Sequence, residues 1–115
     1  MSPAGSCVFC KIAAGEIPAT VVKRADGMLA FKDLSPQAPT HLLVIPTTHV
    51  SSLNDAKDAA TLGKLLAFAR DLAQETGIAT KGYRVVLNTN PDGGQTVFHL
   101  HLHVLGGRPM HWPPG

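Results

Sequence analysis

The chain has 115 residues with a formal net charge of +2, and 44% of the residues are hydrophobic while 16% are charged. This length fits one domain, and the hydrophobic fraction suffices for a core. No run of lysines and arginines occurs, which argues against nucleic-acid binding. The longest apolar run, residues 42–45, is too short to span a membrane, and no signal-peptide pattern is present. We therefore expect a cytoplasmic protein with no membrane partner and with reduced cysteines.

The N-terminal half is expected to hold the smaller elements of the fold. Residues 1–6 are small and polar and are expected to be flexible, and a single domain is expected over residues 7–115. The pattern predicts a short helix at 7–14, a hairpin of strands at 21–24 and 28–32 with a turn at Asp26-Gly27, and a strand buried on both faces at 41–45.

The C-terminal half contains the clearest predicted helix, at residues 58–76. Its apolar residues recur at intervals of three and four and form one stripe: Leu62, Leu65, Leu66, Ala69, Leu72 and Ala73. Asp55 is a candidate N-cap and Gly77 a C-terminal stop. Strands are predicted at 83–89 and 95–105, and an irregular arm at 106–115. Hairpins beside one long helix predict an α+β domain with a mainly antiparallel sheet.

Three histidines alternate with apolar residues in the last predicted strand, at positions 99, 101 and 103. Because successive side chains of a strand point to opposite faces, we expect the imidazoles on one face and the apolar residues Leu100, Leu102 and Val104 on the other. Neighbouring positions on one face lie about 7 Å apart, so all three rings could meet one metal ion only if the strand bent sharply. A catalytic metal would need a further ligand, and the only carboxylate expected near the strand is Asp92.

Nucleophilic chemistry is the other use of such a strand. A neutral imidazole attacks phosphorus well near pH 7, and a second imidazole can donate a hydrogen bond to phosphate oxygens. The preceding loop, residues 92–96, is rich in glycine, so its main-chain N–H groups could approach a phosphate. The pattern therefore favours a site for a phosphate ester or a phosphoramidate. The plainer alternative is a hairpin whose histidines are only surface or core residues.

Residues 99–105, His-Leu-His-Leu-His-Val-Leu, match the signature of the histidine triad superfamily. Further segments resemble its phosphoramidase branch, the histidine triad nucleotide-binding proteins, and this resemblance covers nearly the whole chain from Cys7 onward. The segments are residues 15–19, 33–41, 81–84, 92–95 and 111–115.

The resemblance implies a fold, an assembly and an activity. The fold would be α+β, with a five-stranded antiparallel sheet, one short and one long helix, and a homodimer whose sheets join into one of ten strands. The activity would be hydrolysis of purine nucleoside phosphoramidates, such as conjugates of AMP with an amine, and of aminoacyl adenylates. It would pass through a covalent nucleotidyl-histidine, and no cofactor would take part in that chemistry.

Two other functions stay open at this point. One is hydrolysis of dinucleoside polyphosphates, or nucleotide transfer, by another branch of the same superfamily. The tail at residues 112–115 argues against it because it resembles the phosphoramidase branch. The other is a non-enzymatic regulatory dimer that binds purine nucleotides. The intact triad argues against that function.

The resemblance also implies roles for matching positions. His101 would attack the α-phosphorus, the main-chain carbonyl of His99 would hold its ring in the attacking tautomer, and His103 would contact the phosphate. His41 would belong to a proton relay toward the leaving amine. Thr96 would serve the same relay in a position where this branch usually has serine, and its extra methyl group stiffens the side chain.

The other implied contacts are with the nucleotide. They are Asp33 at the ribose, Leu34, Phe9, Ile12, Ile17 and Phe31 at the base, Asn88, Gly94, Gln95, Thr96 and Val97 at the phosphate, and Trp112 at the partner subunit's site. Plainer alternatives stay open, since Asp33 could cap a turn, His41 could be a buried strand residue, and Trp112 could pack on its own subunit. The apolar residues could equally be ordinary core.

A pair of cysteines, Cys7 and Cys10, is ambiguous by itself. Some histidine triad proteins bind structural zinc through such a pair, a histidine after the central strand and the first triad histidine. This chain has the corresponding His49 and His99, and two thiolates with two imidazoles suit tetrahedral zinc. The resemblance therefore implies a zinc site of these four residues, and the alternative is a pair of free thiols.

Overall fold

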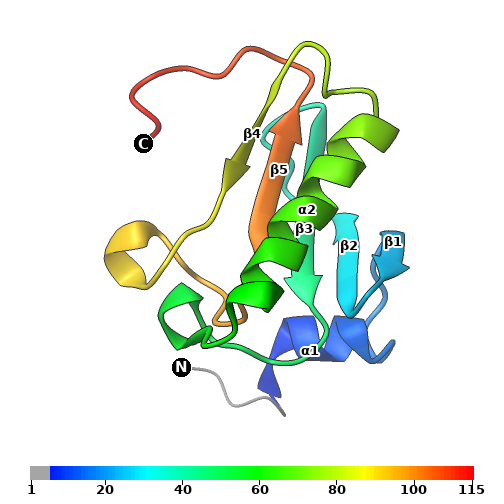
Figure 1. Cartoon of the computed structure of the whole chain (residues 1–115), viewed down its shortest axis with the longest axis vertical. Coiled ribbons are helices and arrows are strands. Elements are labelled where there is room, and N and C mark those ends of the chain that lie inside the picture. The colour runs from blue at the N-terminus through cyan, green and yellow to red at the C-terminus, as the bar shows by residue number, and fades with distance from the viewer. Residues whose placement is uncertain (1–5) are drawn as a thin grey trace.

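The fold is α+β with a five-stranded antiparallel sheet, as expected, in a computed structural model that describes residues 6–115. Of the segment expected to be flexible, residues 1–6, only Ser6 lies within this part of the chain. Along the chain the elements are α1 (Val8–Ala13), β1 (Val21–Ala25), β2 (Met28–Lys32), β3 (Thr40–Pro46), a 3-10 helix (Leu53–Asp55), α2 (Ala59–Glu75), β4 (Tyr83–Val86), a second 3-10 helix (Pro91–Gly93) and β5 (Leu102–Gly106). The strand order is β1-β2-β3-β5-β4 (Figure 1).

Helix α2 lies across one face of the sheet (Figure 1). Its apolar stripe packs on alternate residues of the central strands, except that Leu66 is exposed and Phe68, outside the predicted stripe, is buried. Leu100, Leu102 and Val104 join this core as the alternation predicts. Central strand β3 is buried along nearly its whole length, as expected for a strand covered on both sides. No helix in residues 6–115 is both long and apolar enough to cross a membrane.

The opposite face of the sheet carries the histidines and receives α1. Leu43 of β3 pairs with His103 of β5, and His41 pairs with Leu105 two residues away along the same two strands. His41, Leu43 and His103 therefore point to the same side, where Phe31 and the α1 residue Phe9 also pack. A polar cluster thus sits beside a small apolar one on this face.

The start of α2 differs from the sequence prediction. Asp55 was the expected N-cap, but Asp58 caps the helix: its carboxylate accepts hydrogen bonds from the N–H of Ala60 at 3.0 Å and from the Thr61 hydroxyl at 3.2 Å. Asp55 instead ends the first 3-10 helix and accepts a hydrogen bond from the Ser52 hydroxyl at 3.1 Å. The sequence has two aspartates three residues apart. The first lies in the 3-10 helix that precedes α2, so the second is the one at the start of α2.

The two C-terminal strands are shorter than predicted. Strand β4 ends at Val86 rather than at residue 89, and β5 begins at Leu102 rather than at residue 95. Before β5 the chain is outside the sheet: the N–H of Leu100 donates to the main-chain oxygen of Val50 at 2.6 Å, and Val50 belongs to no strand. His99 and His101 therefore precede the strand, and the expectation that all three triad histidines lie within it is wrong. Their separation from the apolar residues is as expected, because Phe9 contacts the rings of His99 and His101 while Leu100 packs in the core with α2.

Candidate active site

His101 lies just before β5 and is almost completely buried. Its Nδ1 atom is 2.7 Å from the main-chain oxygen of His99. Because a carbonyl can only accept, Nδ1 carries the ring proton and Nε2 keeps an unprotonated lone pair. The ring is also held by an edge-on contact with Phe9, whose centroid is 5.2 Å away. The geometry therefore presents Nε2 of His101 as a nucleophile, in the tautomer that the resemblance implies.

A second pair of rings stands beside His101. The His103 ring centroid is 5.1 Å from that of His101, and Nδ1 of His103 is 2.9 Å from Nε2 of His41. The carboxylate of Asp33 lies 3.4 Å from Nε2 of His41 and 4.0 Å from Nδ1 of His103. A carboxylate is thus close to the triad, which contradicts the expectation that only Asp92 could be. Asp33 comes from the connection between β2 and β3, far from the triad in sequence.

These rings resist protonation. Burial, followed by the neighbouring rings of His101 and His41, lowers the pKa of His103 to about 4, although Asp33 acts in the opposite direction. Burial also lowers the pKa of His101 against the opposing effects of the His99 carbonyl and Asp33. The pKa of His41 is lowered by burial against the effect of Asp33. His103 is therefore neutral near pH 7 and has one ring N–H, which is the group expected to contact the phosphate.

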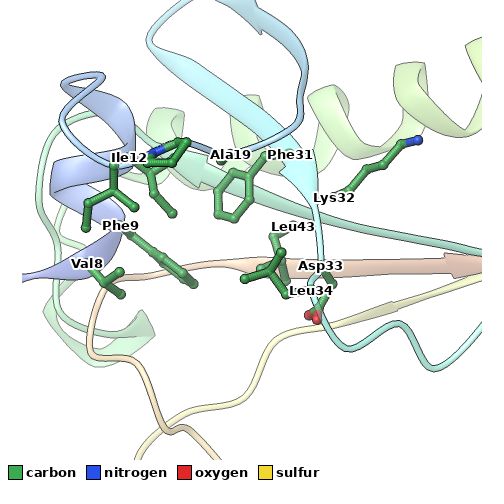
Figure 2. Close-up of a pocket in the computed structure, with 11 residues that line it drawn as sticks. Val8, Phe9, Ile12, Ala19, Phe31, Lys32, Asp33, Leu34 and Leu43 are labelled. Atoms are coloured by element: carbon green, nitrogen blue, oxygen red, sulfur yellow. The ribbon is translucent and has the colours of Figure 1, made fainter.

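An apolar cleft with a volume of about 320 Å³ opens next to these histidines, between α1 and the end of β2 (Figure 2). It brings together the residues expected at the base, Phe9, Ile12, Ile17, Phe31 and Leu34, with Asp33 at its edge. Sequence analysis missed the other lining residues, which are Val8, Pro18, Ala19, Lys32 and Leu43. Leu43 could have been found, because it lies two positions after His41 on the same strand face.

Asp33 has two relationships in this cleft. Its Oδ1 atom accepts a hydrogen bond from the N–H of Ser35 at 2.7 Å, so the turn-cap alternative is also present. Its other oxygen faces His41. In Figure 2 the carboxylate lies beside Leu34 at the end of β2, while the Lys32 side chain points away from the cleft. Leu34 is 97% exposed, so the open side of the cleft has an apolar residue that nothing in residues 6–115 covers.

The loop expected to hold phosphate is built around Gln95. The side-chain oxygen of Gln95 accepts from the N–H of Asn90 at 2.8 Å, and its amide nitrogen donates to Ser51 at 2.8 Å and to Val97 at 3.1 Å. Its side chain is thereby used in shaping the loop. Gly94 has a φ of +85° and passes close to the Asn88 side chain, so both border the same bend. Thr96 is exposed after that bend.

Trp112 is not brought to this site within the chain. It is 82% exposed and lies in the arm that continues beyond β5, away from α1 (Figure 1). The arm is fixed near its start, where Arg108 donates to the main-chain oxygen of Gln37 at 2.9 Å, and further on, where Arg84 donates to that of His111 at 2.8 Å. The alternative that Trp112 packs on its own subunit finds little support in this exposure.

A separate cluster joins Cys7, Cys10, His49 and His99, whose ligand atoms all lie within 4.8 Å of one another. The sulfur of Cys10 is 3.2 Å from Nδ1 of His49 and 3.5 Å from Nδ1 of His99, and that of Cys7 is 3.4 Å from Nδ1 of His99. Tetrahedral zinc with ordinary ligand lengths would put sulfur and nitrogen about 3.6 Å apart. The spacing therefore fits zinc.

The surroundings of the cluster also suit a metal. Nε2 of His99 donates to the main-chain oxygen of Pro46 at 2.8 Å, and Nε2 of His49 lies 3.3 Å from the Ser51 hydroxyl. The carbonyl requires the proton of His99 to be on Nε2, so Nδ1 presents its lone pair to the cluster. Zinc-binding histidines commonly donate their other ring N–H to such a carbonyl. Burial, then a hydrogen bond and the charge of Cys7, raise the pKa of Cys10 to about 11. A cation is what such a partly buried thiol would need in order to ionise.

Comparison with known proteins agrees with this geometry. Residues 14–110 match the HIT domain family. The chain belongs to the histidine triad family. It is 47% identical over 105 residues to the purine nucleoside phosphoramidase of Escherichia coli K12, with coverage of 90% of this chain and 88% of that protein. A HIT family hydrolase from Legionella pneumophila Philadelphia 1 matches with a TM-score of 0.93 and 55% identity, over 96% of this chain and 100% of that one.

These relatives make the chain a hydrolase of the HIT family. A zinc-bound histidine triad family protein from Mycobacterium smegmatis matches with a TM-score of 0.82 and 35% identity, over 92% of this chain and 78% of that one. That protein shows that the fold can hold zinc. Cys7, Cys10, His49 and His99 of this chain could bind it.

Zinc analysis of the purified protein tests the cluster. We expect about one zinc ion per chain, and Cys10→Ser should lose most of it because a hydroxyl is a much weaker zinc ligand than a thiolate. Chelation should lower the melting temperature of the parent but not that of the variant. Ser52→Ala, near the cluster but outside its ligands, should keep the metal. Intact free thiols with less than a tenth of an equivalent of zinc would contradict the site.

Stability should fall as the pH decreases below neutral. The folded pKa of His103, about 4, lies below the ordinary value of 6.5, so the unfolded chain takes up a proton first. The stabilisation is complete above pH 6.5 and is lost as the pH falls toward 4, and the loss reaches about 2 kcal/mol at pH 5. Urea unfolding at pH 7 and pH 5 should show this loss, and His103→Asn should reduce it by about that amount. His111→Asn, at an exposed position, is the control; equal losses in the two variants would refute this assignment.

Proposed function

We propose that this protein hydrolyses the phosphorus–nitrogen bond of conjugates between AMP or another purine nucleotide and an amine, and also aminoacyl adenylates. The observation that carries the proposal is the hydrogen bond from Nδ1 of His101 to the carbonyl of His99. It leaves an unprotonated Nε2 beside an apolar cleft. The 47% identity to a purine nucleoside phosphoramidase supports the choice of this reaction among those of HIT family hydrolases.

The reaction would run in two steps on His101. Nε2 forms a bond to the α-phosphorus while the bond from phosphorus to the amine nitrogen breaks, and the amine takes a proton from water as it leaves. Water then attacks the phosphorus and gives its proton to the hydroxide left by the first step, the bond to Nε2 breaks, and AMP departs. The proton on Nδ1 stays hydrogen-bonded to the His99 carbonyl throughout. His103 would donate its remaining ring N–H to a phosphate oxygen, where charge builds up.

The substrate would lie with its base in the cleft and its phosphate at His101. Phe9 connects the two parts, because its ring contacts both Phe31, with centroids 5.4 Å apart, and His101. Asp33 at the edge of the cleft would accept hydrogen bonds from the ribose hydroxyls. Asn88, Gly94 and the main chain near Gln95, Thr96 and Val97 would surround the phosphate, with the Thr96 hydroxyl exposed toward it.

The assignment of the nucleophile can be tested directly. His101→Ala should reduce the release of AMP from adenosine 5′-phosphoramidate by about a thousandfold or more, because the covalent route is lost. Chromatography of the products measures the rate, and Arg70→Ala, on the exposed part of α2, serves as the control. Near-parental AMP release by the variant would refute the nucleophile. Diadenosine polyphosphate as the preferred substrate, or no turnover of either compound, would favour the alternative enzyme or a binding protein.

We also propose that the protein forms a homodimer through β4. Both sheet edges are free within residues 6–115, but β1 has an irregular register near Val21 and carries Lys23 and Arg24, features that protect an edge. Strand β4 is half-buried along its length. Pairing of two β4 strands would give a continuous sheet and would bring an exposed Trp112 near a second subunit.

We also propose that the protein is cytoplasmic, since its two free thiols fit that reducing compartment.

Sedimentation equilibrium tests the dimer. We expect twice the mass of one chain, and Val86→Lys on β4 should shift the protein toward monomers because like charges would face each other across the paired edges. The matched substitution Val22→Lys on β1 should leave the dimer intact. A monomeric parent protein at micromolar concentration, or dissociation caused only by the β1 substitution, would contradict this interface.

A further inference from the structure

The ring of His41 is held from both sides. The main-chain N–H of Gln37 donates a hydrogen bond to its Nδ1, with 3.0 Å between the two nitrogens. Its Nε2 lies 2.9 Å from Nδ1 of His103 and 3.4 Å from the Asp33 carboxylate. A main-chain amide can only donate, so Nδ1 of His41 accepts and the single proton of the neutral ring is on Nε2. The tautomer of His41 is therefore set by the main chain.

This assignment determines the direction of the next hydrogen bond. Because Nε2 of His41 donates, Nδ1 of His103 accepts, and the proton of neutral His103 is on its Nε2. His41 cannot pass its Nε2 proton to His103 without becoming an imidazolate, since the amide facing Nδ1 has no proton to give up. Protonation of His41 on Nδ1 would bring two N–H groups together. His41 is thus confined to one protonation state.

The donor itself is fixed independently of His41. The side-chain amide of Gln37 donates to the main-chain oxygen of Ser35 at 2.9 Å, and Arg108 donates to the main-chain oxygen of Gln37 at 2.9 Å. The N–H of Ser35 is in turn bound to the Asp33 carboxylate at 2.7 Å. The loop from Asp33 to His41 therefore presents the Gln37 amide in a set position. The charged and titratable groups around His41 are Asp33 and Arg108 through this loop and His103 through β5.

We infer that the main-chain N–H of Gln37 is a positioning group of the active site: it keeps His41 neutral, so that His41 orients His103 as a fixed donor and transfers no proton during turnover. The inference rests on the proposed function and gives His41 a positioning role in place of the relay role that the family resemblance implies. It also distinguishes the cluster around His41 from the cysteine–histidine cluster, whose ligand atoms are similarly spaced. The ligand atoms of Asp33, His41 and His103 lie within 4.8 Å of one another, but a metal needs an unprotonated nitrogen, and Nε2 of His41 holds a proton.

The nitrogen spectrum of the parent protein tests the tautomer without reference to activity. In long-range ¹H–¹⁵N correlation of histidine-labelled protein, assigned with His41→Asn, we expect His41 to show a protonated Nε2 and an unprotonated Nδ1. A proton on Nδ1 would overturn the inference. If the parent protein hydrolyses no phosphoramidate, the spectrum still decides the state of His41, so failure of the proposed function is seen separately.

A pair of variants isolates the Gln37 amide. Gln37→Pro removes the N–H together with the side chain, whereas Gln37→Ala removes only the side chain. We expect the pH midpoint for protonation of His41 to rise by about one unit in Gln37→Pro relative to Gln37→Ala, because loss of one hydrogen bond lets the ring take a second proton beside Asp33. The kcat for AMP release at pH 7 should fall about fivefold in Gln37→Pro relative to Gln37→Ala. Equal midpoints in the two variants would overturn the inference, as would equal kcat values.

Discussion

The hydrogen bond from His101 Nδ1 to the carbonyl of His99 is the interaction on which the rest of the site depends. It decides which nitrogen of His101 is free to react, and it does so through the main chain. This carbonyl belongs to the stretch that precedes β5, where the chain is outside the sheet. The same residue turns its ring the opposite way, toward Cys7 and Cys10. The backbone of His99 therefore belongs to one site and its side chain to the other.

The two sites are also joined mechanically. Helix α1 starts at the cysteine pair and carries Phe9, which packs edge-on against both His99, with centroids 6.0 Å apart, and His101. The position of α1 thus determines the wall of the base cleft and the support of the nucleophile together. A bound metal at the cysteine–histidine cluster would hold the first turn of α1 against the triad. Its effect on catalysis would be one of rigidity, since the chemistry proposed on His101 uses only the imidazole.

Local pattern was enough to predict much of this molecule. Period-two alternation placed Leu100, Leu102 and Val104 in the core, and the stripe on α2 was evident from its spacing. What pattern could not show is where the chain leaves a regular element. Residues 99–105 show the same alternation of histidine and apolar residues whether or not the segment around His99 pairs with a strand. The approach of Asp33 to His103 depends on the sheet bringing two distant segments together, so it was hidden from sequence spacing. Family resemblance supplied the clustering of Cys7 with His99, which distance along the chain would never suggest.

The groups that set both catalytic ring tautomers belong to the main chain: the carbonyl of residue 99 and the N–H of residue 37. Almost every amino acid offers these same two groups, and only proline lacks the N–H. The electronic state of the site is therefore unusually tolerant of side-chain replacement at these two positions. Selection can alter residue 99 for metal binding, or residue 37 for loop packing, without redesigning the nucleophile. A triad held in this way can acquire or lose a metal site during evolution while its reactive nitrogen stays the same.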